Sequence, residues 1–304
     1  PFPGYGIDYQ PTDIVLAPLG APIVVNAVAD PGTGSCDPAE CTLREAINQA
    51  NSVAGPDTIV FNIPGAQCTG PGGSCIIAPA TPLPAISSAL VIDGYTQPGA
   101  SPNTQAPGLG LGSNAVLKIE IDGAALGGTP ALNLNATGVS VLVSGLAIYR
   151  AGSAIQTQGP ADGLYTIAGN FLGLRADGSA APAGQNVGVS IQGGRVEVGL
   201  ANAAGMNVIS GNAAQGIAIS TLPPFSGALI RGNLIGTTPN GLSARPNGLQ
   251  GIIASTPSRL IGISIGGAQA DARNVISGNL QDGIRFDCSA TSDQCFDTGS
   301  VSGN

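Results

Sequence analysis

Short stretches in which apolar and polar residues alternate recur along the chain, and turn-forming residues bracket each one. The clearest four begin with Gly and place apolar side chains two residues apart, at 188–191, 216–219, 251–254 and 283–286. A period of two puts those side chains on one face of an extended segment, which predicts half-buried β-strands. The Gly, Asn and Ser residues around them predict tight turns. The pattern therefore favours an all-β fold built from short strands.

These strands belong to a longer internal repeat. The sequence Asn-Val-Ile-Ser-Gly-Asn occurs at 207–212 and again at 274–279. The Asn residues that follow Gly are spaced by one or two units of roughly 21 to 25 residues, and they are Asn170, Asn212, Asn233, Asn279 and Asn304. Such a unit cannot enclose a core alone, but stacked units bury a continuous apolar column, which predicts a parallel β-helix. Asn residues at equivalent corners are expected to form an amide ladder.

The N-terminal third contains one clear helix signal, at about 42–52. Thr42 and Glu45 form the sequence pattern of a capping box. Leu43, Ala46, Ile47 and Ala50 then define a single apolar face. An amphipathic helix laid across the end of a solenoid hides its hydrophobic cross-section and strand edges, so we expect this helix to act as a cap. Strands are expected at 58–63, 89–93 and 116–122, with a long loop at about 95–114.

The helix segment also carries a recognisable motif. The run Cys41-Thr-Leu-Arg-Glu-Ala46 resembles the Cys-Ser-Leu-Arg-Glu-Ala motif that opens many secreted bacterial β-helix proteins, with Thr42 in place of Ser. The run 92–99, the Ile-Gly-Gly at 265–267 and the Asn-Val-Ile-Ser-Gly-Asn repeats add to the likeness, which covers about residues 25–304. The resemblance implies a right-handed parallel β-helix related in fold to the pectate-lyase-like solenoids. It implies no particular activity, since one fold carries many functions.

Composition narrows the possibilities further. Of the 304 residues, 43% are hydrophobic and only 9% are charged, which excludes a disordered chain. The 47 Gly residues disfavour a helical bundle. The net charge is −8 and the basic residues are scattered singly, so nucleic acid is not an expected partner. There is no apolar run long enough to span a membrane. We expect an extended N-terminal arm at 1–22 and one β-helix domain of about nine or ten coils at 23–304.

The six cysteines fall into three close pairs, which are Cys36/Cys41, Cys68/Cys75 and Cys288/Cys295. There is no His and no Cys-x-x-Cys spacing, so a zinc site is not expected. Although fifteen pairings are formally possible, the local one is favoured because each pair lies within one loop. Three local disulfides imply an oxidising, extracellular or cell-surface location.

Candidate catalytic groups are few. The absence of His excludes a Ser-His-Asp or Cys-His nucleophile. If the protein is an enzyme, the best candidates are Asp93, Lys118, Glu120 and Asp122, because a polysaccharide lyase or a glycosidase needs clustered carboxylates or a basic side chain. Alternation in 116–122 predicts that Lys118, Glu120 and Asp122 point away from the coil interior, and Asp93 could stack one coil away. The alternative is an ordinary solvated, charged face with turn-forming Asp residues.

Two further features give weaker signals. Asp282, Asp287, Asp293 and Asp297 surround the Cys288/Cys295 loop and could hold calcium through oxygen ligands, although their spacing matches no EF-hand. Tyr149 and Tyr165 could stack against a sugar, or could serve in ordinary packing. No other cofactor is expected.

These observations favour a secreted or cell-surface structural solenoid over an enzyme. It is expected to self-associate through the N-terminal arm, by strand addition of Thr12-Asp-Ile-Val-Leu-Ala17, or through an open C-terminal coil, building an extracellular fibre or acting as an adhesin. The alternative is a carbohydrate-active enzyme (a lyase, epimerase or hydrolase) on the same fold, and a polysaccharide is a possible partner of either. Whether the chain continues after Asn304 is left open.

Overall fold

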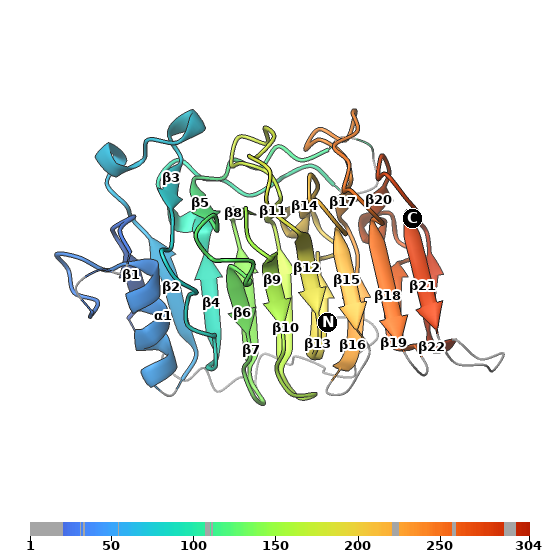
Figure 1. Cartoon of the computed structure of the whole chain (residues 1–304), viewed down its shortest axis with the longest axis horizontal. Coiled ribbons are helices and arrows are strands. Elements are labelled where there is room, and N and C mark those ends of the chain that lie inside the picture. The colour runs from blue at the N-terminus through green and yellow to red at the C-terminus, as the bar shows by residue number, and fades with distance from the viewer. Residues whose placement is uncertain are drawn as a thin grey trace.

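The chain folds into three parallel β-sheets that run along one axis. The computed structural model describes residues 21–304 except 31, 33, 54, 107–109, 111, 221–224, 257–259 and 289–295. Within these residues each sheet takes its strands from successive turns of the chain, and every strand pairing is parallel. Figure 1 shows the strands side by side along the long axis of the molecule, with the helix α1 at one end. This is the parallel β-helix that the repeats predict.

The sheets are named here in the order in which the chain visits them. Sheet A consists of β1 (Ile23–Val25), β2 (Asp57–Phe61), β4 (Leu90–Asp93), β7 (Ser140–Ser144), β10 (Leu164–Ala168), β13 (Gly194–Val198), β16 (Phe225–Ile230), β19 (Leu260–Gly266) and β22 (Phe296–Ser302). Sheet B consists of β3 (Cys75–Ile77), β5 (Ile119–Asp122), β8 (Leu146–Tyr149), β11 (Phe171–Leu172), β14 (Val208–Ile209), β17 (Leu234–Ile235) and β20 (Val275–Ile276). Sheet C consists of β6 (Leu132–Leu134), β9 (Ser153–Thr157), β12 (Val187–Ile191), β15 (Ile217–Ser220), β18 (Ile252–Thr256) and β21 (Ile284–Cys288).

Aliphatic side chains from successive turns stack inside the solenoid. In sheet A the register places eight of them in one column, each at most 5% exposed: Ile23, Ile59, Ile92, Val143, Ile167, Val198, Ile230 and Ile265. Each fully buried aliphatic side chain contributes about 1.5–3 kcal/mol to folding. Stacking therefore supplies the core that no single turn could enclose.

The turns are less uniform than the repeat suggests. Leu164 pairs with Ser140, 24 residues earlier, whereas Val141 pairs with Leu90, 51 residues earlier. The expected unit of about 21 to 25 residues is therefore wrong, because loops of different length are inserted at the corners between strands. The four Gly-initiated segments are confirmed as β12, β15, β18 and β21, which lie next to one another in sheet C.

A column of glycines allows these four strands to approach closely. A Cβ on Gly188 would lie 2.5 Å from the carbonyl oxygen of Gly216, and one on Gly216 would lie 2.6 Å from that of Gly251. A Cβ on Gly251 would lie 2.7 Å from the Gly283 oxygen. Any side chain at Gly188, Gly216 or Gly251 would push neighbouring turns apart, which explains why Gly begins these three segments.

Helix α1 (Leu43–Ser52) caps the N-terminal end of the solenoid, as predicted. Thr42 is the N-cap: its side chain accepts a hydrogen bond from the Glu45 amide (3.3 Å), and the Glu45 carboxylate accepts one from the Thr42 amide (2.8 Å). The predicted apolar face, comprising Leu43, Ala46, Ile47 and Ala50, is buried. In Figure 1 the helix lies beside β1 and β2, whose core-facing residues it covers.

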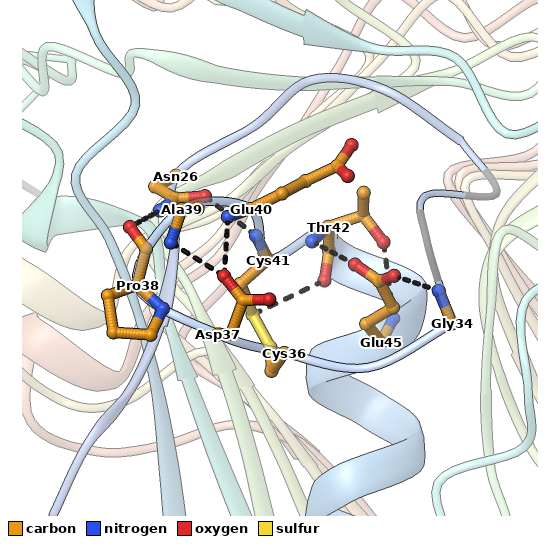
Figure 2. Close-up of a disulfide and its surroundings, with 10 residues drawn as sticks. All are labelled: Asn26, Gly34, Cys36, Asp37, Pro38, Ala39, Glu40, Cys41, Thr42 and Glu45. Carbon is orange, nitrogen blue, oxygen red and sulfur yellow. Dashed lines mark hydrogen bonds between the residues drawn. A yellow bond between two sulfur atoms is a disulfide. The ribbon is translucent and has the colours of Figure 1, made fainter.

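Two local disulfides brace this end of the molecule, between Cys36 and Cys41 and between Cys68 and Cys75. Both of these predicted pairings are confirmed. Figure 2 shows how the first joins the loop before the helix to the helix N-terminus. Asn26, which follows β1, fastens the same loop, because its side chain accepts from the Cys41 amide (2.7 Å) and donates to the Pro38 carbonyl (3.1 Å).

The third predicted disulfide belongs to the opposite end of the chain. The described residues include the backbone of Cys288, which ends β21, but not its side chain. Cys295 lies outside the described residues altogether. The expected pairing of Cys288 with Cys295 is therefore not confirmed, in contrast to the other two, and it stays a prediction. The argument for an oxidising location consequently rests on the two N-terminal disulfides alone.

The contacts of Arg44 account for the basic residue in the run 41–46. Its guanidinium group makes two hydrogen bonds to the Asp30 carboxylate, at 2.7 and 2.9 Å. It also donates to the carbonyls of Thr81 and Pro82, both at 2.8 Å. Cys41, Leu43 and Ala46 are buried while Arg44 and Glu45 secure the flanking loops, so each residue of the run has a structural task in the cap.

Sheet B is covered on its outer side by loops. The described parts of residues 95–118, named here the strap, run along the solenoid axis (Figure 1) and contact later turns. Tyr95 donates to the Gly169 carbonyl (2.6 Å), Asn103 to the Ala203 carbonyl (2.9 Å) and the Ser113 amide to the Pro239 carbonyl (2.7 Å). A second apolar cluster fills the space beneath: Leu117, Ala147, Phe171, Leu174, Ala176, Met206, Val208 and Leu234. Among the described residues, no helix is both long and apolar enough to cross a membrane.

Candidate functional site

Sheet B carries three of the four candidate catalytic residues. Lys118 immediately precedes β5, and Glu120 and Asp122 lie within it. Asp93 instead ends β4 in sheet A, where it pairs with Ser144, while Asp122 pairs with Tyr149 in sheet B. The expected stacking of Asp93 on Asp122 is therefore wrong. Both residues lie in an Ile-Asp-Gly sequence, at 92–94 and 121–123, but these two sequences end strands of different sheets and so do not meet at the same edge.

Glu120 lies at the centre of a buried polar cluster. It points away from the solenoid interior, as the alternation predicts, yet it is 0% exposed. One carboxylate oxygen accepts from the Ser74 hydroxyl (2.8 Å) and the Ala176 amide (3.2 Å). The other accepts from the Tyr149 hydroxyl (2.6 Å) and from Arg175 (3.3 Å). Glu120 thus connects β5 to the segment before β3, to β8 and to the loop after β11.

Arg175 also contacts the neighbouring aromatic ring. Its guanidinium carbon lies 5.3 Å from the centre of the Tyr149 ring, within the range of a cation–π contact. The positive charge therefore faces both the Glu120 carboxylate and the face of the ring. This arrangement holds the loop that contains Arg175 and Ala176 over sheet B, which closes solvent access to Glu120.

Asp122 forms a second ion pair, with Arg150. The Arg150 Nε atom donates to Asp122 at 2.6 Å, and a second guanidinium nitrogen donates to the other carboxylate oxygen. Asp122 is 7% exposed, so it too is largely covered. Among the described residues other than glycine, Arg150 alone has a positive φ, of 62°. The sharp corner after β8 therefore places the Arg150 side chain against the corner after β5.

Lys118 lines a small open cavity of about 280 Å³ between the strap and the neighbouring loops. Its ammonium group donates to the Gly72 carbonyl at 2.5 Å. The apolar walls include Leu117, Phe171 and Pro239, and Asp177 is part of the lining. Partial burial acts to raise the pKa of Asp177, but hydrogen bonds from Ser179 and the charge of Arg175 outweigh it and lower that pKa. Glu120 does not line this cavity.

The two tyrosines considered as sugar platforms serve in packing. Tyr149 and Tyr165 are both fully buried. The Tyr165 hydroxyl donates to the Ala136 carbonyl at 2.7 Å, and the Tyr149 hydroxyl donates to Glu120. Neither ring offers a face to a ligand, so the stacking interpretation is wrong for both.

Raising the pH above about 10 should destabilise the fold, because two buried tyrosines and a partly buried one resist ionisation. Burial raises the pKa of Tyr95, Tyr149 and Tyr165 above the ordinary value of 10.0, and for Tyr149 the hydrogen bond to Glu120 adds to the shift. The unfolded chain ionises at that ordinary pKa, so this stability is complete below it and is lost as the pH rises. Urea midpoints measured from pH about 8 to about 11 check this. Midpoints that stay constant would contradict it, and Tyr95→Phe should reduce the slope.

The predicted Asn residues form two amide ladders rather than one. Along the corner between sheets A and B, hydrogen bonds at 2.8–3.2 Å connect successive side chains of Asn170, Asn207, Asn233, Asn274 and Asn304. Between sheets B and C, bonds at 2.7 and 2.8 Å connect Asn212, Asn247 and Asn279. The expectation of a single ladder is wrong, because the two Asn residues of each Asn-Val-Ile-Ser-Gly-Asn motif occupy different corners.

The ladders are uniformly oriented, and their members are buried except at the C-terminal end, where Asn279 is partly buried and Asn304 is exposed. At every step the amide nitrogen of one Asn donates to the side-chain oxygen of the Asn in the next turn. The glycines that precede the five predicted Asn residues all have φ between 62° and 77°, a conformation that favours Gly. Asn207, Asn247 and Asn274 were missed by the sequence reasoning because they do not follow Gly, although two of them begin the repeated motif.

The calcium hypothesis concerns four Asp residues around the Cys288/Cys295 loop, and two of them lie wholly or partly beyond the described part of the chain. Asp293 and the side chain of Asp297 lie outside it, while Asp287 accepts a hydrogen bond from Arg285 at 2.8 Å. Asp282 is exposed. Within the residues that the structure describes, no three His, Cys, Asp or Glu side chains are grouped as a metal site would require. The calcium site stays a prediction.

Comparison with known proteins adds no functional assignment. No protein-family model matches the chain, and no curated protein matches its sequence.

Proposed function

We propose that this protein is a secreted or cell-surface structural solenoid, a rigid element that associates with copies of itself or with a surface. The main observation in support is that the candidate catalytic carboxylates are already engaged in buried contacts. Glu120 and Asp122 are buried in ion pairs with Arg175 and Arg150, and these pairs attach loops and corners to sheet B. Removing one partner of a buried ion pair is strongly destabilising, which supports a structural role for both carboxylates.

A rigid extracellular rod also accounts for the bracing of the fold. The two local disulfides fasten loops at the capped end, and disulfides persist in oxidising compartments. The amide ladders and the strap connect successive turns. These features resist local opening, which is the route by which proteases reach a folded chain.

The alternative function, a carbohydrate-active enzyme, would need a different arrangement of the same residues. A glycosidase requires two carboxylates that face the scissile bond, about 5–10 Å apart. Glu120 has no exposed surface, and Asp93 lies in another sheet. Lys118 lines a cavity whose walls are mainly apolar and from which Glu120 is absent. The structural role therefore has more support than the catalytic one.

Self-association through the N-terminal arm belongs to this proposal. Residues 1–20 lie outside the described part of the chain, so the argument rests on the sequence. Thr12-Asp-Ile-Val-Leu-Ala17 is a short apolar segment that could add a strand to a neighbouring copy. Such a head-to-tail contact propagates without closing and would build a fibre.

The proposal predicts assembly that depends on concentration. Sedimentation velocity and electron microscopy of the protein over a range of concentrations should show growing oligomers or fibres. Val15→Pro should abolish assembly, because Pro cannot donate to a β-ladder, whereas Val15→Ala should not. A protein that stays monomeric at every concentration, and that cleaves a polysaccharide, would favour the enzyme instead.

A further inference from the structure

The outer faces of the three sheets differ in charge. The strap and its neighbouring loops cover sheet B, as described above. Sheet A presents charged side chains, among them Asp93, Arg195, Glu197 and Arg231, in or directly after its strands. In sheet C, the strands from β6 to β18 contain no charged residue at all. This outer surface of β6, β9, β12, β15 and β18 is named here the amide face.

The register of sheet C arranges the amide face in rows. One row consists of outward side chains that are paired from strand to strand: Asn133, Gln156, Ser190, Ala218 and Ile253. A second row lies two residues further along each strand and consists of Gln158, Gln192, Ser220 and Ser255. All of these side chains are partly or fully exposed. Neighbouring strands are about 4.8 Å apart, so polar groups recur at that interval along the second row and, in the first row, from β6 to β12.

Hydrogen bonds between the side chains hold this face in place. Asn133 donates to Gln158 at 3.0 Å, and Gln158 donates to Gln192 at 3.3 Å. Gln192 in turn donates to the Ser190 hydroxyl at 3.2 Å. An amide has two donor hydrogens and an oxygen with two lone pairs, so the exposed Gln158 and Gln192 side chains keep capacity for a ligand. Side chains that are already ordered lose less entropy on binding.

We propose that the amide face binds a neutral, hydroxyl-rich polysaccharide that lies along the solenoid axis. Sugar hydroxyls donate and accept hydrogen bonds, as Asn, Gln and Ser side chains do. A face without charges desolvates no ion when a neutral polymer binds, whereas it offers an acidic polymer no counter-charge. The net charge of −8 also repels a polyanion. This inference rests on the proposed function, since it names the surface partner of an extracellular rod.

The test is binding of the full chain to polysaccharides of different charge. Co-sedimentation with cellulose and chitin, together with affinity electrophoresis in a soluble neutral glucan, is compared with binding to polygalacturonate. The protein should bind at least one neutral polymer and not the acidic one. Because no ion pair is involved, the neutral binding should be unchanged between low and high salt.

A matched pair of variants locates the site. Ser190→Lys places a charge at the centre of the amide face and should weaken binding about tenfold or more. Thr166→Lys places the same charge on the outer face of β10 in sheet A and should leave binding unchanged. Circular dichroism melting curves for both variants establish that they fold, and Ser190→Gln should retain binding because it keeps a polar, neutral side chain.

Several outcomes would overturn the inference. Binding to none of the neutral polymers would do so, as would equal losses in Ser190→Lys and Thr166→Lys. Preferential, salt-sensitive binding to polygalacturonate would also contradict it. If Ser190→Lys instead abolishes self-association without any effect on polysaccharide binding, the face is an interface between copies. If the protein still assembles through its N-terminal arm, any of these results would contradict only the polysaccharide inference and not the proposed structural function.

Discussion

Glu120→Ala should lower the free energy of unfolding by about 3–5 kcal/mol, the usual cost of removing one partner from a buried ion pair. The substitution leaves Arg175 without its carboxylate and leaves the hydroxyls of Ser74 and Tyr149 without their acceptor. The loop that contains Ala176 also loses its attachment to β5. Urea or thermal unfolding measures the change directly.

Two comparison variants separate burial from the loss of charge. Glu120→Gln keeps the volume and one oxygen acceptor, so its cost should lie between that of Glu120→Ala and zero. Glu197→Ala removes the partner of Arg231 in sheet A, where both side chains are partly exposed, and should cost about 1 kcal/mol or less. Equal effects of Glu120→Ala and Glu197→Ala would show that the Glu120 cluster does not hold the loops.

Asn233→Ala should destabilise the solenoid by about 3 kcal/mol, because several buried groups lose a hydrogen-bond partner together. The Asn233 amide donates to the Val198 carbonyl (2.8 Å) and to Asn274 (2.9 Å), and its oxygen accepts from Asn207 (2.9 Å). Asn233→Asp should be equally harmful, since it replaces a donor with a charge in a buried row. Equilibrium unfolding gives the size of both effects.

An exposed asparagine provides the control. Asn186 lies on the surface outside both ladders, and Asn186→Ala should change the stability by no more than about 0.5 kcal/mol. Asn247→Ala in the second ladder should resemble Asn233→Ala. A ladder whose members behave like Asn186 would be a geometric coincidence of the corners rather than a source of stability.

Much of the architecture could be predicted because it depends on local patterns. Alternation identified four of the six described strands of sheet C, and the repeated motifs indicated that the chain winds in successive turns. The capping helix was predicted with its N-cap, because the Thr42–Glu45 pair and the apolar face are both written within a few residues.

Close spacing of cysteines is a local pattern of the same kind. It correctly predicted the disulfides between Cys36 and Cys41, five residues apart, and between Cys68 and Cys75, seven residues apart. The same reasoning pairs Cys288 with Cys295, but Cys295 is not among the described residues, so this third disulfide is not confirmed.

The predictions that proved wrong or incomplete concern how separate turns of the chain are arranged relative to one another. The intervals between Asn residues suggested one unit length, but they combined two different corners, as Asn212 and Asn233 show. Alternation correctly oriented Glu120 away from the interior, yet it could not reveal that Arg175 and Ala176, 55 and 56 residues later, would bury it. A pattern with a period of two assigns a side chain to a face of a sheet, and carries no information about the loops that cover that face.

The side-chain hydrogen bonds of the Asn ladders all run in the same direction, which has a consequence for how the number of turns can change. The segment 207–273 begins with one copy of Asn-Val-Ile-Ser-Gly-Asn and ends just before the other, so it spans two whole turns. Tandem duplication of that segment would insert turns whose donors and acceptors match those already present on either side. Length can therefore change by copying, without a newly invented contact, and the gene for such a rod can lengthen or shorten its product while the rules of stacking stay the same.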